Sequence, residues 1–142
     1  MNAMARKHIL SAGIVPLREI DGMPRLLLLR CYRYWDFPKG EVGPNEDPLA
    51  AAQRETAEET GLTQLDFRWG HDFYETPPYA GGKVARYYIA AAPIGDVTLP
   101  ISPELGRPEH HEYRWVTLDQ AHTLLNERLR AVLAWARVRL EV

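Results

Sequence analysis

One short stretch, from residue 40 to residue 62, constrains this chain more than any other feature of the sequence. It begins in a segment rich in Gly, Pro, Asn and Asp, which predicts a loop. Asp47 is a favourable N-cap, and Pro48 suits the first helical position because its missing N–H needs no partner there. Consecutive alanines favour the helix that follows, and Gly61 is placed to end it. The sequence therefore predicts a loop that leads into a helix over residues 47–61.

This helix carries three carboxylates close together. At about 100° per residue, Glu55, Glu58 and Glu59 fall on one side of the helix, largely opposite its apolar residues. Like charges at spacings of three and four residues repel one another and weaken a helix. A hard divalent cation such as Mg²⁺, which binds oxygen ligands, would offset this repulsion. The alternative is a solvated acidic face with Arg54 as a partial counter-ion.

The whole stretch GEVGPNEDPLAAAQRETAEETGL follows the pattern G-x5-E-x7-R-E-U-x-E-E-x-G-U, where U is a bulky aliphatic residue. The matching positions are Gly40, Glu46, Arg54, Glu55, Glu58, Glu59, Gly61 and Leu62. Thr56 departs from the pattern at the first U position, but a β-branched side chain can still face the core. The chain therefore resembles the Nudix hydrolase family, whose signature is this pattern, the Nudix box.

The resemblance implies an α/β fold: an α/β/α sandwich with a mixed β-sheet and a catalytic loop–helix–loop. It also implies hydrolysis of a nucleoside diphosphate linked to a further group, with Mg²⁺ as cofactor and Mn²⁺ as a substitute. Carried over to this chain, the metal ligands are Glu55, Glu58 and Glu59, assisted by the Gly40 carbonyl. Arg54 would orient these glutamates by charge-assisted hydrogen bonds. Glu46 would be a structural partner on the loop.

Three segments outside the box resemble the diadenosine tetraphosphate hydrolase branch of the family. They are WDFPKG before the box, the strand-like KVARYY, and EHHEYRW near the C-terminus. The resemblance implies that Lys39 and Lys83 contact phosphates and that Tyr87 stacks on a base. It also implies that Glu109 is a further metal ligand or the general base. Tyr79, in a Pro/Gly loop, is a second candidate for stacking.

The predicted activity is therefore metal-dependent hydrolysis of dinucleoside tetraphosphates to a nucleoside triphosphate and a monophosphate. The small-molecule nucleotide would be the main partner. One alternative keeps the chemistry and changes the substrate to a diphosphoinositol polyphosphate, an RNA 5′ end or a single nucleotide. A second alternative is a Nudix domain that binds a nucleotide without turnover, although such domains usually lose box glutamates and all are present here.

Composition limits the remaining possibilities. The 142 residues suit a single domain over residues 1–142. A net charge of −2 gives no bulk basic field, so no stable nucleic-acid binding is expected. One cysteine, Cys31, excludes an internal disulfide framework. Purely apolar runs, such as residues 26–29, are too short for a membrane span, and no export signal is visible. We expect a cytoplasmic protein that is a monomer or a weak homodimer.

Hydrophobic patterning predicts strands on both sides of the box helix. The predicted strands are residues 8–17, 24–31, 63–75, 82–92 and 112–118, with a hairpin turn at residues 20–23. Residues 93–110 are predicted to form a long loop, and residues 119–140 to be largely helical. Strands that precede, separate and follow helices favour a sheet covered on both faces.

Overall fold

A computed structural model of the chain describes residues 9–142, so residue 8 of the first predicted strand lies outside the described residues. The strands are β1 (Ile9–Ile20), β2 (Met23–Cys31), β3 (Tyr34–Asp36), β4 (Lys39–Glu41), β5 (Phe73–Glu75), β6 (Lys83–Ala91), β7 (Ile101–Ser102), β8 (Arg107–Pro108) and β9 (Glu112–Thr117). The helices are α1 (Pro48–Thr60), α2 (Leu118–Leu124) and α3 (Glu127–Leu140).

The larger sheet is mixed, as predicted. Its main strands lie in the order β3-β2-β1-β6-β5, with β4 paired to β1 and β9 paired to β2. The central pair, β1 and β6, is parallel, whereas every other pairing of the sheet is antiparallel. A parallel pair needs a crossover connection, and α1 lies within the chain that joins these two strands. The predicted turn at residues 20–23 closes the hairpin between β1 and β2.

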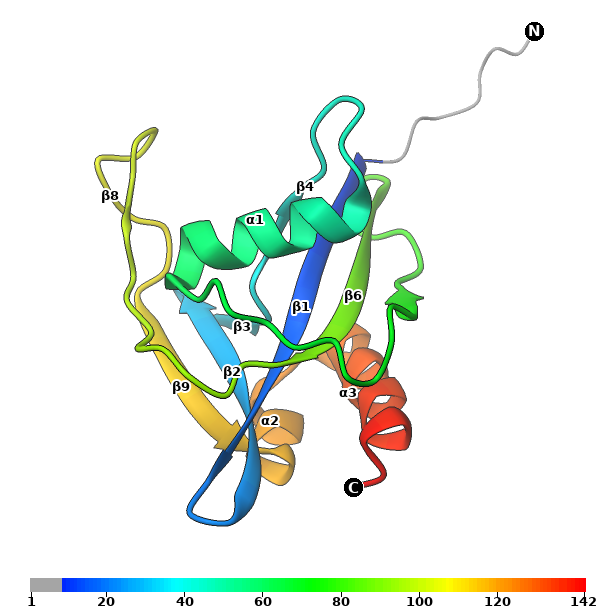
Figure 1. Cartoon of the computed structure of the whole chain (residues 1–142). Helices are drawn as coiled ribbons and strands as arrows, with labels where there is room; N and C mark the ends of the chain where they lie inside the picture. The colour runs from blue at the N-terminus through cyan, green and yellow to red at the C-terminus, as the bar shows by residue number, and fades with distance from the viewer. Residues whose placement is uncertain (1–8) are drawn as a thin grey trace, which may run out of the picture.

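Helices cover both faces of the sheet (Figure 1), which confirms the predicted α/β arrangement. Side chains of a strand alternate between faces, and the core follows this rule. Ile14 and Tyr88 pack with α1 in one apolar cluster. Their neighbours Val15 and Tyr87 belong to another cluster, which includes residues of α2 and α3. The sheet therefore separates α1 from the C-terminal helices.

Local sequence determines both ends of α1. The Asp47 side chain accepts a hydrogen bond from the Ala50 N–H, and Pro48 occupies the first turn. Gly61 ends the helix in the left-handed conformation, with a φ of 79°, which glycine adopts without a steric penalty. Thr56 is fully buried and donates its hydroxyl to the Ala52 carbonyl, so the residue that departs from the box pattern does face the core.

Three predicted segments differ in the structure. Of residues 63–75, only β5 forms a strand, because just this part and an isolated bridge from Asp66 to Ala91 reach the edge of β6. The predicted loop of residues 93–110 contains the small hairpin β7–β8. Residues 119–140 form two helices, because Asn126 caps the start of α3 and interrupts the run. No helix within residues 9–142 is long and apolar enough to cross a membrane.

Candidate active site

Arg54 lies at the centre of an ion-pair network on the outer side of α1. Its guanidinium donates two hydrogen bonds to the Glu46 carboxylate, from Nε at 2.8 Å and from Nη2 at 2.9 Å. Its Nη1 donates to Glu55 at 2.8 Å and to Glu58 at 3.2 Å. The hydrogen bonds from Arg54 to Glu46, and then the bond from the Gly43 N–H, lower the pKa of Glu46 to about 2. Arg54 thus fixes the orientation of two box glutamates and holds the preceding loop through Glu46.

The side chain of Glu55 passes directly over Gly40, the first residue of the box. A Cβ atom at position 40 would overlap the Glu55 carboxylate, so a larger residue there would displace this carboxylate from its bond to Arg54. Gly40 is part of β4, which pairs with β1, and this pairing fixes the loop against the helix. Burial raises the pKa of Glu55, and the opposing influence of Arg54 only partly compensates. The box glycine therefore leaves room for the Glu55 carboxylate in the position that it occupies beside Arg54.

Glu59 is the most perturbed carboxylate of the site. Its Oε1 accepts a hydrogen bond from the Lys39 backbone N–H at 3.2 Å. Burial, and then the nearby Glu109, raise the pKa of Glu59 to about 10. Burial and two neighbouring carboxylates thus disfavour the charged form of Glu59, and a nearby cation would favour it.

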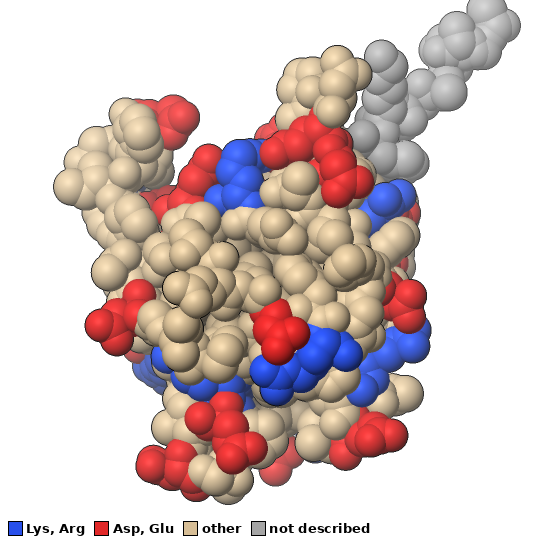
Figure 2. Space-filling model, viewed as in Figure 1, with Lys and Arg blue, Asp and Glu red and all other residues tan. Residues whose placement is uncertain are grey.

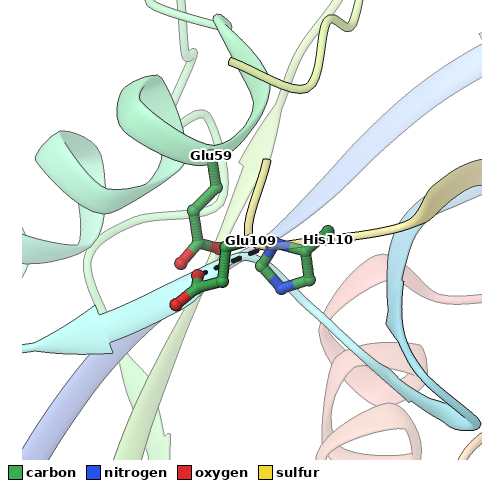
Figure 3. Close-up of side chains that lie close together, drawn as sticks. All are labelled: Glu59, Glu109 and His110. Atoms are coloured by element: carbon green, nitrogen blue, oxygen red, sulfur yellow. Dashed lines mark ion pairs between the residues drawn. The ribbon is translucent and has the colours of Figure 1, made fainter. Parts of the chain in front are cut away.

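Glu109 and His110 join this cluster from the loop that precedes β9, so residues distant in the sequence meet at one point (Figure 3). One ligand atom of each of Glu59, Glu109 and His110 lies within 4.8 Å of the other two. His110 Nδ1 is 3.8 Å from Glu109 Oε2. Burial lowers the pKa of His110, which favours its neutral form. The His110 side chain is half-buried and lines the cavities on both sides of the carboxylates.

This donor set fits a divalent cation. Clustered carboxylate oxygens are the ligands that Mg²⁺ and Mn²⁺ prefer, and an imidazole nitrogen is compatible with Mn²⁺. Three acidic side chains and one imidazole converge here, and a bound cation would stabilise the charged forms of the carboxylates. Glu55, Glu59, Glu109 and His110 line two adjoining cavities, one on either side of the cluster.

The first of these, which we call the lysine-side cavity, has a volume of about 470 Å³. Lys39, Gly40 and Lys83 line it, and their contacts with phosphates and a metal stay predictions. The Lys39 ammonium lies 3.7 Å from Asp36 Oδ2. Burial alone would lower the pKa of Lys39, but Asp36 and other neighbours outweigh it and the pKa is raised. Lys39 therefore stays charged although it is half-buried.

The structure contradicts the stacking role predicted for Tyr87. Its side chain has no exposed surface, and its ring packs edge-on against Phe37. The reason is the alternation along β6, which turns Tyr87 toward α3 and Tyr88 toward α1. The Tyr87 hydroxyl instead donates a 2.9 Å hydrogen bond to Asp36 Oδ1. The Tyr87 hydroxyl thus positions Asp36, the carboxylate that pairs with the Lys39 ammonium.

Two other tyrosines line the lysine-side cavity in its place. Tyr34 is 61% exposed. Tyr79, which the sequence indicated as a second candidate for stacking on a base, is half-buried. The guanidinium of Arg128 stacks 3.8 Å from the centre of the Tyr79 ring and supports it from α3. Sequence reasoning missed Tyr34 and Asp36. The signal was present in WDFPKG, where Asp36 stands three residues before Lys39.

The second cavity, which we call the hairpin-side cavity, has a volume of about 600 Å³ and lies between α1 and the hairpin β7–β8. Arg54, Glu58 and Glu104 line it together with the shared carboxylates. Of the site residues predicted from sequence, the structure brings together eight around these two cavities: Lys39, Gly40, Arg54, Glu55, Glu58, Glu59, Lys83 and Glu109. Tyr87 is the exception.

Comparison with known proteins agrees with this geometry. A model of the NUDIX domain matches residues 7–136. The asymmetrical bis(5′-nucleosyl)-tetraphosphatase of Caenorhabditis elegans is 34% identical over 117 residues, which cover 78% of this chain and 80% of that protein. An RNA pyrophosphohydrolase of Caulobacter vibrioides is 34% identical over 136 residues, covering 84% of this chain and 77% of that protein.

Solved structures extend the likeness to the fold. The crystal structure of a C. elegans Ap4A hydrolase binary complex superposes with a TM-score of 0.77 at 28% identity, covering 94% of this chain and 98% of that one. A MutT protein from Methanosarcina mazei Go1 superposes with a TM-score of 0.66 at 25% identity. Since the domain model covers most of the chain and these relatives align over most of their own length, the protein belongs to the Nudix hydrolase family.

Proposed function

We propose that this enzyme hydrolyses dinucleoside tetraphosphates to a nucleoside triphosphate and a nucleoside monophosphate, with Mg²⁺ as its cofactor. The observation that carries the proposal is the lysine-side cavity. There the carboxylate cluster adjoins two lysines, Lys39 and Lys83, and two accessible tyrosines, Tyr34 and Tyr79. Ammonium groups suit a polyphosphate chain, and tyrosine rings suit a purine or pyrimidine of any identity. The asymmetrical tetraphosphatase from C. elegans supports the same substrate.

In this proposal, Glu55, Glu58, Glu59 and Glu109 hold the metal, and the Gly40 carbonyl assists. Bound Mg²⁺ would neutralise the phosphates and lower the pKa of an attacking water. Arg54 keeps Glu55 and Glu58 in position through the hydrogen bonds described above. Lys39 binds a phosphate oxygen, and Asp36 limits the directions in which its ammonium can point.

Glu109 takes the proton from the attacking water. It stands beside the buried Glu59 but belongs to a different segment, and its side chain is 55% exposed. An exposed carboxylate can release the acquired proton to solvent after each turnover. In this assignment the box helix supplies most of the metal ligands, and the loop supplies one further ligand and the group that accepts the proton.

Hydrolysis at an RNA 5′ end is a second candidate, favoured by the long alignment to the RNA pyrophosphohydrolase of C. vibrioides. It shares the carboxylate cluster and the pyrophosphate chemistry. It differs in needing a path for the rest of an RNA strand, and the chain carries a net charge of −2. A polyanion is attracted to a basic surface, so this balance favours the smaller substrate.

A substrate panel tests the proposal. The purified protein is incubated with Mg²⁺ and equal concentrations of diadenosine tetraphosphate, ATP, a diphosphoinositol polyphosphate and a short 5′-triphosphorylated RNA, and the products are separated by chromatography. We expect diadenosine tetraphosphate to give ATP and AMP with the highest kcat/KM. The Glu55→Gln variant controls for contaminating hydrolases. A higher kcat/KM on the RNA would overturn the proposal in favour of the second candidate.

A further inference from the structure

We propose that the hairpin-side cavity binds the second nucleoside of a dinucleoside substrate. This inference rests on the proposed function, because only a substrate with two nucleosides needs a second base site. The lysine-side cavity then takes one nucleoside and the phosphates next to it. The hairpin β7–β8 becomes the element that distinguishes substrates with two nucleosides from those with one.

The two cavities are arranged for a substrate that crosses the carboxylate cluster. Glu55, Glu59, Glu109 and His110 line both, so the cavities meet at the proposed metal site and extend from it to different sides. If the phosphoanhydride bond that is cleaved lies at this junction, one part of the substrate lies in each cavity. A dinucleoside tetraphosphate has a nucleoside at each end of its phosphate chain, which matches two cavities that share one reactive centre.

The charges of the cavities assign the phosphates to one of them. Lys39 and Lys83 line the lysine-side cavity. Among the described residues, Arg54 is the single Lys or Arg that lines the hairpin-side cavity, and its guanidinium is already bonded to Glu46, Glu55 and Glu58. Glu58 and Glu104 add negative charge there. These carboxylates would repel a polyphosphate chain that entered the hairpin-side cavity, but they would not repel an uncharged nucleoside.

The wall that faces these acids is apolar and stiff. It is formed by Leu99, Pro100, Ile101, Pro103 and Pro108. Ile101 is 68% exposed, an unusual state for a residue of its kind, and a base lying on it would remove that surface from water. Prolines have restricted backbones, so the wall loses little conformational entropy when a ligand binds. Figure 2 shows the hairpin standing away from the body of the protein beside α1, with acidic groups below it.

The cavity also offers size and polar groups suited to a nucleoside. Its volume of about 600 Å³ exceeds that of the lysine-side cavity, at about 470 Å³. Small-molecule sites commonly fall between about 300 and 1,000 Å³. The Ser102 hydroxyl donates to Glu104 Oε2 at 3.0 Å, and both residues line the cavity. The remaining carboxylate oxygen can accept a hydrogen bond from a ribose hydroxyl or an exocyclic amino group.

Substitution of Ile101 tests the inference, with Leu105 as the matched control. Leu105 lies in the same hairpin and is 49% exposed, but it does not line the cavity. We compare the wild type with Ile101→Ser, Ile101→Phe and Leu105→Ser. For each protein we measure KM for diadenosine tetraphosphate and the inhibition constant of adenosine 5′-tetraphosphate, which has the charged chain but one nucleoside. Thermal melting confirms that each variant folds.

We expect Ile101→Ser to raise KM for the dinucleotide roughly fivefold, because less apolar surface is removed from water on binding. Ile101→Phe should lower this KM, since it offers the base an aromatic surface. The inhibition constant of adenosine 5′-tetraphosphate and both constants of Leu105→Ser should match the wild type. Equal changes on both ligands in the Ile101 variants, or no change on either, would overturn the inference. That result would leave the proposed function standing, whereas failure of the wild type to cleave the dinucleotide would remove both.

Discussion

The box helix α1 and the loop of residues 93–110 supply the same site, but the sequence specifies them to very different degrees. Caps, alanines and the spacing of the glutamates determine α1 from local sequence. Glu109 reaches the site only because β9 pairs with β2 and brings the end of the loop beside α1. The period of a helix determines which of its side chains lie together. The position of a loop side chain depends instead on the elements that the loop joins. The following predictions test this division.

The largest effect is expected on the helix, from Glu58→Gln. Loss of a carboxylate from the centre of the box should lower kcat by about 10³-fold, because it removes stabilisation of the phosphoryl charge. The Glu58 side chain is 56% exposed, so the fold should survive and the melting temperature of the metal-free protein should hold or rise. Steady-state kinetics and thermal melting measure both. More than a tenth of wild-type kcat would contradict the role of Glu58.

The next effect is expected on the loop, from Glu109→Gln. If Glu109 accepts the proton of the attacking water, kcat should fall by roughly 10²-fold with a smaller change in KM. Glu104→Gln is the matched control, since Glu104 belongs to the same loop but bonds to Ser102. Glutamine keeps an oxygen that can accept a hydrogen bond, so kcat of Glu104→Gln should stay close to that of the wild type, with any effect confined to KM. If Glu104→Gln lowers kcat strongly and Glu109→Gln does not, the loop glutamate has been assigned wrongly.

A smaller effect is expected from Tyr79→Ala, which removes an aromatic wall of the lysine-side cavity. Stacking on a base contributes about 1–3 kcal/mol, so KM for diadenosine tetraphosphate should rise by about tenfold. The inhibition constant of tripolyphosphate, which has no base, should stay constant. Equal changes in the two constants would show that Tyr79 only packs against Arg128.

The smallest effect is expected from Tyr87→Phe. This change keeps the buried ring and removes the hydroxyl that donates to Asp36. The free energy of unfolding should fall by about 1 kcal/mol, measured by denaturant titration. Because Asp36 accompanies Lys39, KM for the dinucleotide and the inhibition constant of tripolyphosphate should both rise, by about twofold to threefold. Wild-type stability together with wild-type values of both constants would contradict a role of this hydroxyl in positioning Asp36 and Lys39.

The limits of prediction from sequence follow the same division. Both caps of α1, the burial of Thr56 and the bonds from Arg54 to Glu55 and Glu58 follow from local pattern and the resemblance to the family. The orientation of Tyr87 could not be derived, because both faces of β6 are buried and alternation does not say which face adjoins the site. The same limit applies to β5, whose length depends on how much of its neighbour is free to pair.

His110 and Asp36 show a second limit. Each looks like an ordinary polar loop residue in the sequence. Each gains its position from contacts between segments, His110 beside Glu59 and Asp36 between Tyr87 and Lys39. Polar side chains near a motif are therefore identified by tertiary contacts, whereas those inside the motif are identified by spacing.

The central claim is that helix and loop build one metal site, and Mn²⁺ binding tests it most directly. Electron paramagnetic resonance measures free Mn²⁺ in titrations of the wild type, Glu59→Gln, Glu109→Gln and Glu104→Gln. We expect Mg²⁺ to compete with Mn²⁺ on the wild type. Glu59→Gln and Glu109→Gln should each weaken Mn²⁺ binding by at least about tenfold, since even indirect partners of a metal contribute that much. Glu104→Gln should bind like the wild type. Wild-type Mn²⁺ affinity in Glu109→Gln would contradict a site shared by the helix and the loop.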